Sequence, residues 1–173
     1  RQVTQRNAGR TTAGVDGEIA LTPARRMEVA VRVHHTISSW QPLPVKRVYI
    51  PKANGKQRPL GVPVIVDRVL QARVVNALEP EWEARFEPKS YGFRPGRGCH
   101  DAIESIYKTV AGKAAHRLWV LDADLAAAFD RIDHTHFLAA LGSFPARDRI
   151  AQWLPAGVVE REQLTPTLAG TPQ

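Results

Sequence analysis

The chain has few of the features that mark secreted or membrane proteins. Its single cysteine, Cys99, excludes an internal disulfide and fits a reducing compartment. No apolar run approaches the ~20 residues that a transmembrane helix needs. No apolar stretch follows the polar N-terminus, which argues against a secretory signal. The sequence therefore predicts a protein without a membrane partner.

An initiator methionine is also missing, since the only methionine is Met27, and the chain ends in the loop-like residues 170–173. Both ends are expected to be cuts through a longer protein. Acidic residues are in the minority, with 17 Asp and Glu against 24 Lys and Arg, which gives a net charge of +7. This balance indicates either a polyanionic partner or a solvated basic surface, and charge alone leaves both open.

A β-hairpin is the clearest local prediction. Residues 45–50 and 57–62 are rich in strand-forming side chains, and Asn54-Gly55 between them tolerates the positive φ of a tight turn. Pro59 has no N–H to donate, so the second strand is expected at a sheet edge.

Helical periodicity predicts four further elements. They cover residues 23–38, then a helix from about 66 that ends or kinks at Pro80, then 101–111, and finally 134–141 capped by Asp133. In the first of these helices, Met27, Val31 and Ile37 recur at roughly helical spacing. In the third, the apolar residues from Ile103 to Val110 should face the core, and Gly112 should end the helix.

Residues 118–121 are predicted to form a buried strand that runs directly into Asp122 and Asp124. Period-two alternation places both carboxylates on one face. A buried carboxylate is costly unless it is paired or binds a metal, and Mg²⁺ prefers such oxygen ligands. The same spacing also permits surface ion pairs or a capping role, so a metal site and a structural role both stay open.

The segment from Asp124-Leu125 through Phe129-Asp130 resembles the first catalytic motif of reverse transcriptases, in the version typical of group II introns. The resemblance implies that Asp124 is the catalytic carboxylate that binds both Mg²⁺ ions, with the backbone carbonyl of Leu125 as a further metal ligand. It also implies that Phe129 is the steric gate that selects dNTP over rNTP. Without the resemblance, Phe129 would be read as a core aromatic residue.

Residues 49–63, which read YIPKANGKQRPLGVP, place three cations around the predicted hairpin tip. Such a tip could grip a triphosphate or could be a solvated turn. The block resembles the fingers hairpin of the same family. That resemblance implies that Lys52 and Arg58 contact the phosphates of the bound nucleotide, with Lys56 as a weaker candidate for nucleic-acid contact.

Three shorter blocks also resemble the family. Residues 91–102 look like its fingers-to-palm block, in which Arg94 and Arg97 could hold template phosphates. An internal ion pair is favoured for Arg94 and a nucleic-acid contact for Arg97. Residues 170–173 resemble the start of a motif whose glutamine, here Gln173, lies against the nucleotide pocket. Residues 13–17 resemble an N-terminal loop that helps to bind template or intron RNA.

The resemblance implies an α+β, right-hand polymerase-like fold that is truncated: fingers made of helices plus a β-hairpin, and the first part of a palm sheet. The expected domains are an N-terminal extension over 1–22, fingers over 23–115 and a partial palm over 116–173. An open edge of an incomplete sheet would invite self-association.

The implied activity is RNA-directed DNA polymerisation by two-metal nucleotidyl transfer, with an RNA template, intron RNA, a DNA primer and dNTP as partners. The implied location is the cytoplasm of a prokaryotic cell, or an organelle, in association with nucleic acid. No Tyr-x-Asp-Asp motif occurs in the sequence, so the chain alone is expected to be inactive. The alternative is a non-catalytic maturase module that binds intron RNA as a splicing cofactor.

Overall fold

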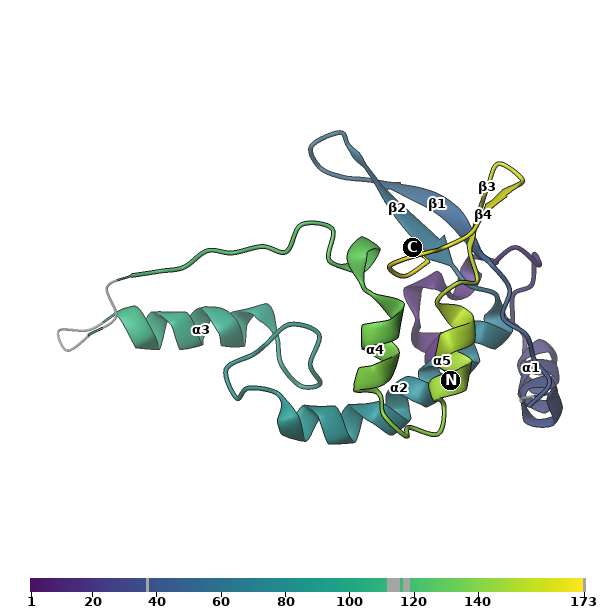
Figure 1. Cartoon of the computed structure of the whole chain (residues 1–173), viewed down its shortest axis with the longest axis horizontal. Coiled ribbons are helices and arrows are strands. Elements are labelled where there is room, and N and C mark those ends of the chain that lie inside the picture. Colours follow the sequence, from purple (N-terminus) through teal and green to yellow (C-terminus); the bar gives the residue numbers. More distant parts are fainter. Residues whose placement is uncertain (37, 112–115, 117–118, 173) are drawn as a thin grey trace. The chain divides into compact units, whose positions relative to one another are not determined.

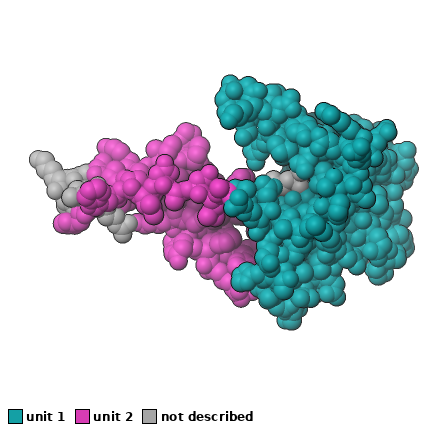
Figure 2. Space-filling view, turned by 45° about the horizontal axis from the view of Figure 1, so that its top comes forward, with its two compact units in different colours: residues 1–74, 127–173 teal, residues 75–126 magenta. Residues whose placement is uncertain are grey.

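The computed structural model describes residues 1–36, 38–111, 116 and 119–172. They form two compact units, which Figure 2 shows in different colours. Unit 1 comprises residues 1–74 and 127–173, and unit 2 comprises residues 75–126. Among the described helices, none has both the length and the apolar character needed to cross a bilayer.

A four-stranded mixed sheet organises unit 1 (Figure 1). Its strands are β1 (Val45–Pro51), β2 (Gln57–Val62), β3 (Val158–Glu160) and β4 (Gln163–Thr165), in the order β2-β1-β3-β4. β1 pairs antiparallel with β2 and parallel with β3, and β3 pairs antiparallel with β4. The predicted hairpin is confirmed, with Gly55 at a φ of +76° and Pro59 on the edge strand β2.

The first long helix, α1 (Pro23–Thr36), confirms the predicted element. It buries Val29 and Val33, one turn apart, whereas Met27 and Val31 are 66% and 48% exposed. The apolar spacing noted in the sequence therefore belongs to the solvent side of this helix. Ile37 lies outside the described residues. The buried stripe joins a core of Val3, Ala20, Val29, Val33, Ile65, Val66 and Leu70.

The second helix, α2 (Ile65–Arg85), continues through Pro80 and so does not end there, while the kink predicted as the other outcome stays a prediction. Proline removes one helical hydrogen bond, the one to the carbonyl of residue 76. Both Asn76 and Pro80 are exposed, so water can satisfy that carbonyl. Further along, the amide of Phe86 still donates to the carbonyl of Trp82 at 3.0 Å.

Short elements complete unit 1. They are η1 (Gln2–Arg6), η2 (Ala8–Thr11), η3 (Phe129–Arg131), α4 (His134–Ala140) and α5 (Arg147–Trp153). The predicted cap of α4 is confirmed, because the Asp133 carboxylate accepts a hydrogen bond from the amide of His136 at 2.6 Å.

Unit 2 contains the end of α2, a long loop and α3 (Cys99–Val110). The predicted helix is confirmed, but its apolar face is not buried: Ile103 and Tyr107 are 61% and 68% exposed. Periodicity identifies an apolar stripe and cannot say whether a neighbour covers it. Gly112, expected to end this helix, lies outside the described residues.

The predicted buried strand over 118–121 is wrong for its described residues. Trp119 and Leu121 are 94% and 90% exposed and have no strand pairing. A strand needs a neighbour to satisfy its N–H and C=O groups. The described strands pair only with one another, within unit 1. The fold is thus α+β in the general sense of helices with one mixed sheet, while fingers, palm and the three domain boundaries stay predictions.

Candidate nucleotide and nucleic-acid site

The tip of the β1–β2 hairpin is held by its own backbone. The Lys52 amide donates to the Lys56 carbonyl at 2.7 Å, and the Gly55 amide donates to the Lys52 carbonyl at 3.0 Å. The Asn54 side chain accepts from the Lys56 amide at 3.1 Å. These bonds fix the backbone of the turn that carries Lys52 and Lys56, and the pairing of Ile50 with Arg58 fixes the start of β2 beside it.

All three cations are exposed. Within the part of the chain that the structure describes, none of them takes part in an ion pair. Their charge is therefore uncompensated by protein carboxylates and available to an anionic ligand. Arg58 can present a planar fork to phosphate, whereas lysine acts as a point charge.

The hairpin is braced on its other side by β3. The hydroxyl of Tyr49, on β1, donates to the carboxylate of Glu160, on β3, at 2.8 Å. This hydrogen bond raises the pKa of Tyr49 above its ordinary value. No pattern in the sequence predicted β3, so this hydrogen bond between Tyr49 and Glu160 was not expected.

Phe129 is held against the end of the chain. It begins η3 and its side chain is 61% exposed. The amide of Gly170 donates to the carbonyl of Ile132 at 2.8 Å, and the amide of Thr171 donates to the carbonyl of Phe129 at 2.8 Å. The structure thus joins two blocks that the sequence assigned to one nucleotide pocket. Gln173 itself lies outside the described residues.

Asp124 belongs to unit 2, in an exposed stretch without regular structure that also contains Asp122 and Leu125. No ion pair engages Asp124 among the described residues. Its carboxylate and the Leu125 carbonyl are hard oxygen donors of the kind that suits Mg²⁺, but they make only part of a coordination shell. The described residues contain no group of three or more His, Cys, Asp or Glu side chains that could hold a metal.

Arg94 is an internal residue of its loop. Its guanidinium donates to both Glu83 carboxylate oxygens and to the carbonyls of Glu83, Glu87 and Ser90. These contacts use all five N–H donors of an arginine. The hydrogen bond holds the pKa of Glu83 below its ordinary value, so this pair contributes stability at neutral pH and loses it as the pH falls through that lowered pKa. The internal ion pair favoured from the sequence is present, and no donor remains for a phosphate.

Arg97 is also used within the loop, although it stays partly exposed. Its guanidinium donates to the carbonyls of Pro88 and Ser90. It also lies over the ring of Tyr91, 5.6 Å from the centroid. A contact between Arg97 and nucleic acid stays a prediction.

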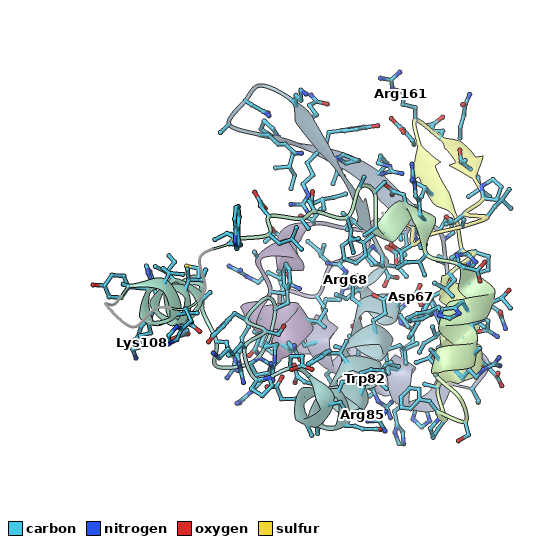
Figure 3. All side chains as sticks on the ribbon, turned by 60° about the vertical axis from the view of Figure 1, so that its left-hand side comes forward. Asp67, Arg68, Trp82, Arg85, Lys108 and Arg161 are labelled. Atoms are coloured by element: carbon cyan, nitrogen blue, oxygen red, sulfur yellow. The ribbon has the colours of Figure 1, made fainter. Side chains whose placement is uncertain are left out.

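Sequence reasoning missed the importance of Asp67 and Arg68, neighbours on α2 that Figure 3 labels. Asp67 is 1% exposed and accepts three hydrogen bonds: from the indoles of Trp40 and Trp153, both at 2.9 Å, and from the amide of Leu43 at 3.2 Å. The available signal was an acidic residue inside an apolar run at a helix start, where a buried carboxylate needs donors.

Arg68 fixes the N-terminal segment. It donates to the carbonyls of Gly9 at 2.9 Å and Thr12 at 2.8 Å, and burial lowers its pKa. Close by, a Cβ added to Gly14 would lie 2.7 Å from the Val64 Cα, so only glycine fits there. Together these contacts hold residues 9–14 near the start of α2.

A cavity of about 650 Å³ lies between residues 16–22 and α1. Its charges are largely matched within the wall, since Arg32 pairs with Glu18 and Arg25 pairs with Glu28. Asp16 and Gly17, from the loop predicted to bind RNA, line it, but none of the described residues predicted for the nucleotide site does. It offers a polyanion less than the hairpin tip does.

Comparison with known proteins identifies the class. Residues 50–173 match the family "Reverse transcriptase (RNA-dependent DNA polymerase)", and residues 1–33 match the "N-terminal domain of reverse transcriptase". The chain belongs to the reverse transcriptase family, within its group II intron branch.

Two bacterial proteins illustrate the relationship. "Protein YkfC" of Escherichia coli K12 is 40% identical over 145 residues, which cover 81% of this chain and 38% of that protein. "Group II intron-encoded protein LtrA" of Lactococcus lactis is 36% identical over 140 residues, covering 78% and 23%. A plant protein, "Nuclear intron maturase 1, mitochondrial" of Arabidopsis thaliana, is 41% identical over 71 residues, covering 41% and 9%. The chain spans less than two fifths of the length of each.

Proposed function

We propose that this chain supplies the nucleotide-gripping hairpin and the first catalytic carboxylate of an RNA-directed DNA polymerase of the group II intron type. The observation that carries the proposal is the hairpin tip, where three exposed, uncompensated cations stand on a backbone fixed by hydrogen bonds. In this proposal Lys52 and Arg58 bind the triphosphate of a dNTP and hold it for in-line attack.

Asp124 and the Leu125 carbonyl are proposed to hold Mg²⁺. Two such ions, when bound, lower the pKa of the primer 3′-hydroxyl and stabilise the leaving pyrophosphate. The exposed, unpaired state of Asp124 supports the role, since nothing in the described chain competes for its oxygens. Further carboxylates are needed, and because the sequence has no Tyr-x-Asp-Asp motif, we expect no polymerase activity from these residues alone.

Phe129 is proposed as the gate against the 2′-hydroxyl of an rNTP, with Gln173 beside the same pocket. Support comes from the half-exposed ring of Phe129 and from the backbone bonds that hold its carbonyl to Thr171. An exposed aromatic side chain on a fixed backbone can act as a steric limit.

The hairpin is tested in a chimaera in which these 173 residues replace the matching segment of a full-length, active reverse transcriptase of the family. Lys52→Ala and Arg58→Ala should each raise KM for dNTP about ten- to hundredfold, because each removes a charged hydrogen bond to phosphate. Lys46→Ala is the matched control, since Lys46 is an exposed cation on the same hairpin, away from its tip. An equal effect of all three variants, or none, would contradict the nucleotide role.

A second candidate function is binding of intron RNA as a maturase, which the name of the plant relative favours. Affinity of the chain for single-stranded RNA should fall steeply with salt, because bound cations release counterions. The plot of log K against log salt has a negative slope. Replacing Lys52, Lys56 and Arg58 together by alanine should make that slope shallower by about 2 if all three side chains contact phosphate. An unchanged slope would place the RNA elsewhere. If the chimaera supports splicing but makes no DNA, the maturase function is favoured over the polymerase function.

A further inference from the structure

The peptide group between Gly170 and Thr171 is held at both of its polar atoms. Its N–H, on Thr171, donates to the carbonyl of Phe129 at 2.8 Å. Its carbonyl oxygen, on Gly170, lies 2.6 Å from Nε2 of His134. A third bond, from the Gly170 amide to the Ile132 carbonyl at 2.8 Å, fixes the preceding peptide. The backbone beside the proposed gate is therefore fixed by one side chain and two backbone carbonyls.

Only glycine fits at position 170, and a glycine there makes the backbone easier to rotate. Gly170 is buried and has a φ of +75°. A Cβ there would lie 2.5 Å from the Phe129 carbonyl oxygen and 2.6 Å from backbone atoms of Asp130. Close approach thus excludes any side chain. The same lack of a side chain makes rotation of the following peptide group cheap, and rotation would withdraw the N–H that holds Phe129.

His134 is placed to prevent that rotation. It is the first residue of α4, and Asp133 caps the helix through the His136 amide. A carbonyl oxygen only accepts hydrogen bonds, so Nε2 of His134 must carry the hydrogen and donate. The imidazole thereby opposes any turn of the Gly170–Thr171 peptide plane.

We propose that His134 is a positioning residue for nucleotide selection. Its Nε2–H donates to the Gly170 carbonyl and so keeps the Phe129 ring in the position from which it excludes rNTP and admits dNTP. The inference rests on the gate role proposed for Phe129. His134 does not touch the nucleotide in this account. It acts through the backbone of Gly170 and Thr171.

The hydrogen bond is tested first in the 173-residue chain, by ¹⁵N NMR of the imidazole and by amide exchange. The imidazole should show the Nε2–H tautomer. His134→Gln places an amide N–H near the position of Nε2, whereas His134→Asn places it near Nδ1 and cannot reach. Exchange of the Thr171 amide should be about two- to tenfold faster in H134N, the range for one hydrogen bond, and near normal in H134Q. Equal exchange in both variants and the parent overturns the proposal.

The selection role is then tested in the chimaera, by comparing kcat/KM for dNTP and rNTP. H134N should lower the dNTP preference about two- to tenfold, chiefly by raising kcat/KM for rNTP, and H134Q should restore it. Phe129→Ala separates the two hypotheses. If F129A leaves selection unchanged, the proposed gate is wrong. If F129A relaxes selection and H134N does not, the gate stands and the positioning role of His134 is wrong.

Discussion

Replacing Asp67 with alanine should lower the free energy of unfolding by about 4.5 kcal/mol, from three hydrogen bonds to a buried carboxylate at roughly 1.5 kcal/mol each. The carboxylate is 1% exposed and accepts from two indoles and one amide. These donors come from α5 and from the segment that leads into β1. Asp67 thus ties α2 to both, and its loss leaves three donors without an acceptor.

The measurement is urea denaturation of the chain, followed by tryptophan fluorescence, with Trp40 and Trp153 as local probes. The free energy of unfolding of Asp67→Asn should lie between those of the parent and D67A, because the amide side chain keeps one acceptor oxygen. Asp148→Ala is the control, since that side chain is 95% exposed and should change stability by less than about 0.5 kcal/mol. A loss below about 1 kcal/mol in D67A would show that water replaces the carboxylate at little cost.

Asp67 also shows where sequence reasoning stops. Helical periodicity predicted α2 but said nothing of what surrounds this residue. Its three donors lie 24, 27 and 86 positions away in the chain. No local pattern contains that information. The burial of a carboxylate without a neighbouring cation is explained by the two indole N–H groups that donate to it.

Elements with local chemical signals were predictable. The β1–β2 turn has Asn54-Gly55, α1 begins at a proline, and α4 has an aspartate cap, all confirmed. The β3–β4 hairpin was missed because Arg161 and Glu162 occupy its turn at φ values of 49° and 68°. Turns with positive φ usually contain glycine or asparagine, which makes them recognisable in a sequence. Figure 3 labels Arg161 at this hairpin tip.

Apolar patterning was less reliable for burial than for secondary structure. The stripe of α3 and the segment from Trp119 to Leu121 were both predicted to be buried, and both are exposed. A sequence pattern identifies apolar side chains that would gain from burial. It does not show which element, if any, packs against them. Self-association, which was predicted for an open sheet edge and not for these surfaces, stays a prediction.

Asp124→Ala is expected to have the largest effect on activity. In the chimaera it should reduce DNA synthesis at least about a thousandfold, because several kcal/mol of metal-based stabilisation are lost. Asp124→Asn should do nearly the same, since the amide keeps the size of the side chain but loses its charge. Stability should be unaffected, since Asp124 is exposed and has no ion pair in the described chain.

The most direct measurement is RNA-templated DNA synthesis by the chimaera carrying Asp124→Ala, beside the same protein carrying Asp148→Ala. Both variants should retain the thermal unfolding midpoint of the parent and the same affinity for RNA. We predict that D148A extends the primer at the parental rate and that D124A extends it no faster than background. Primer extension by D124A at a rate near that of D148A would contradict the assignment of Asp124 as the catalytic carboxylate.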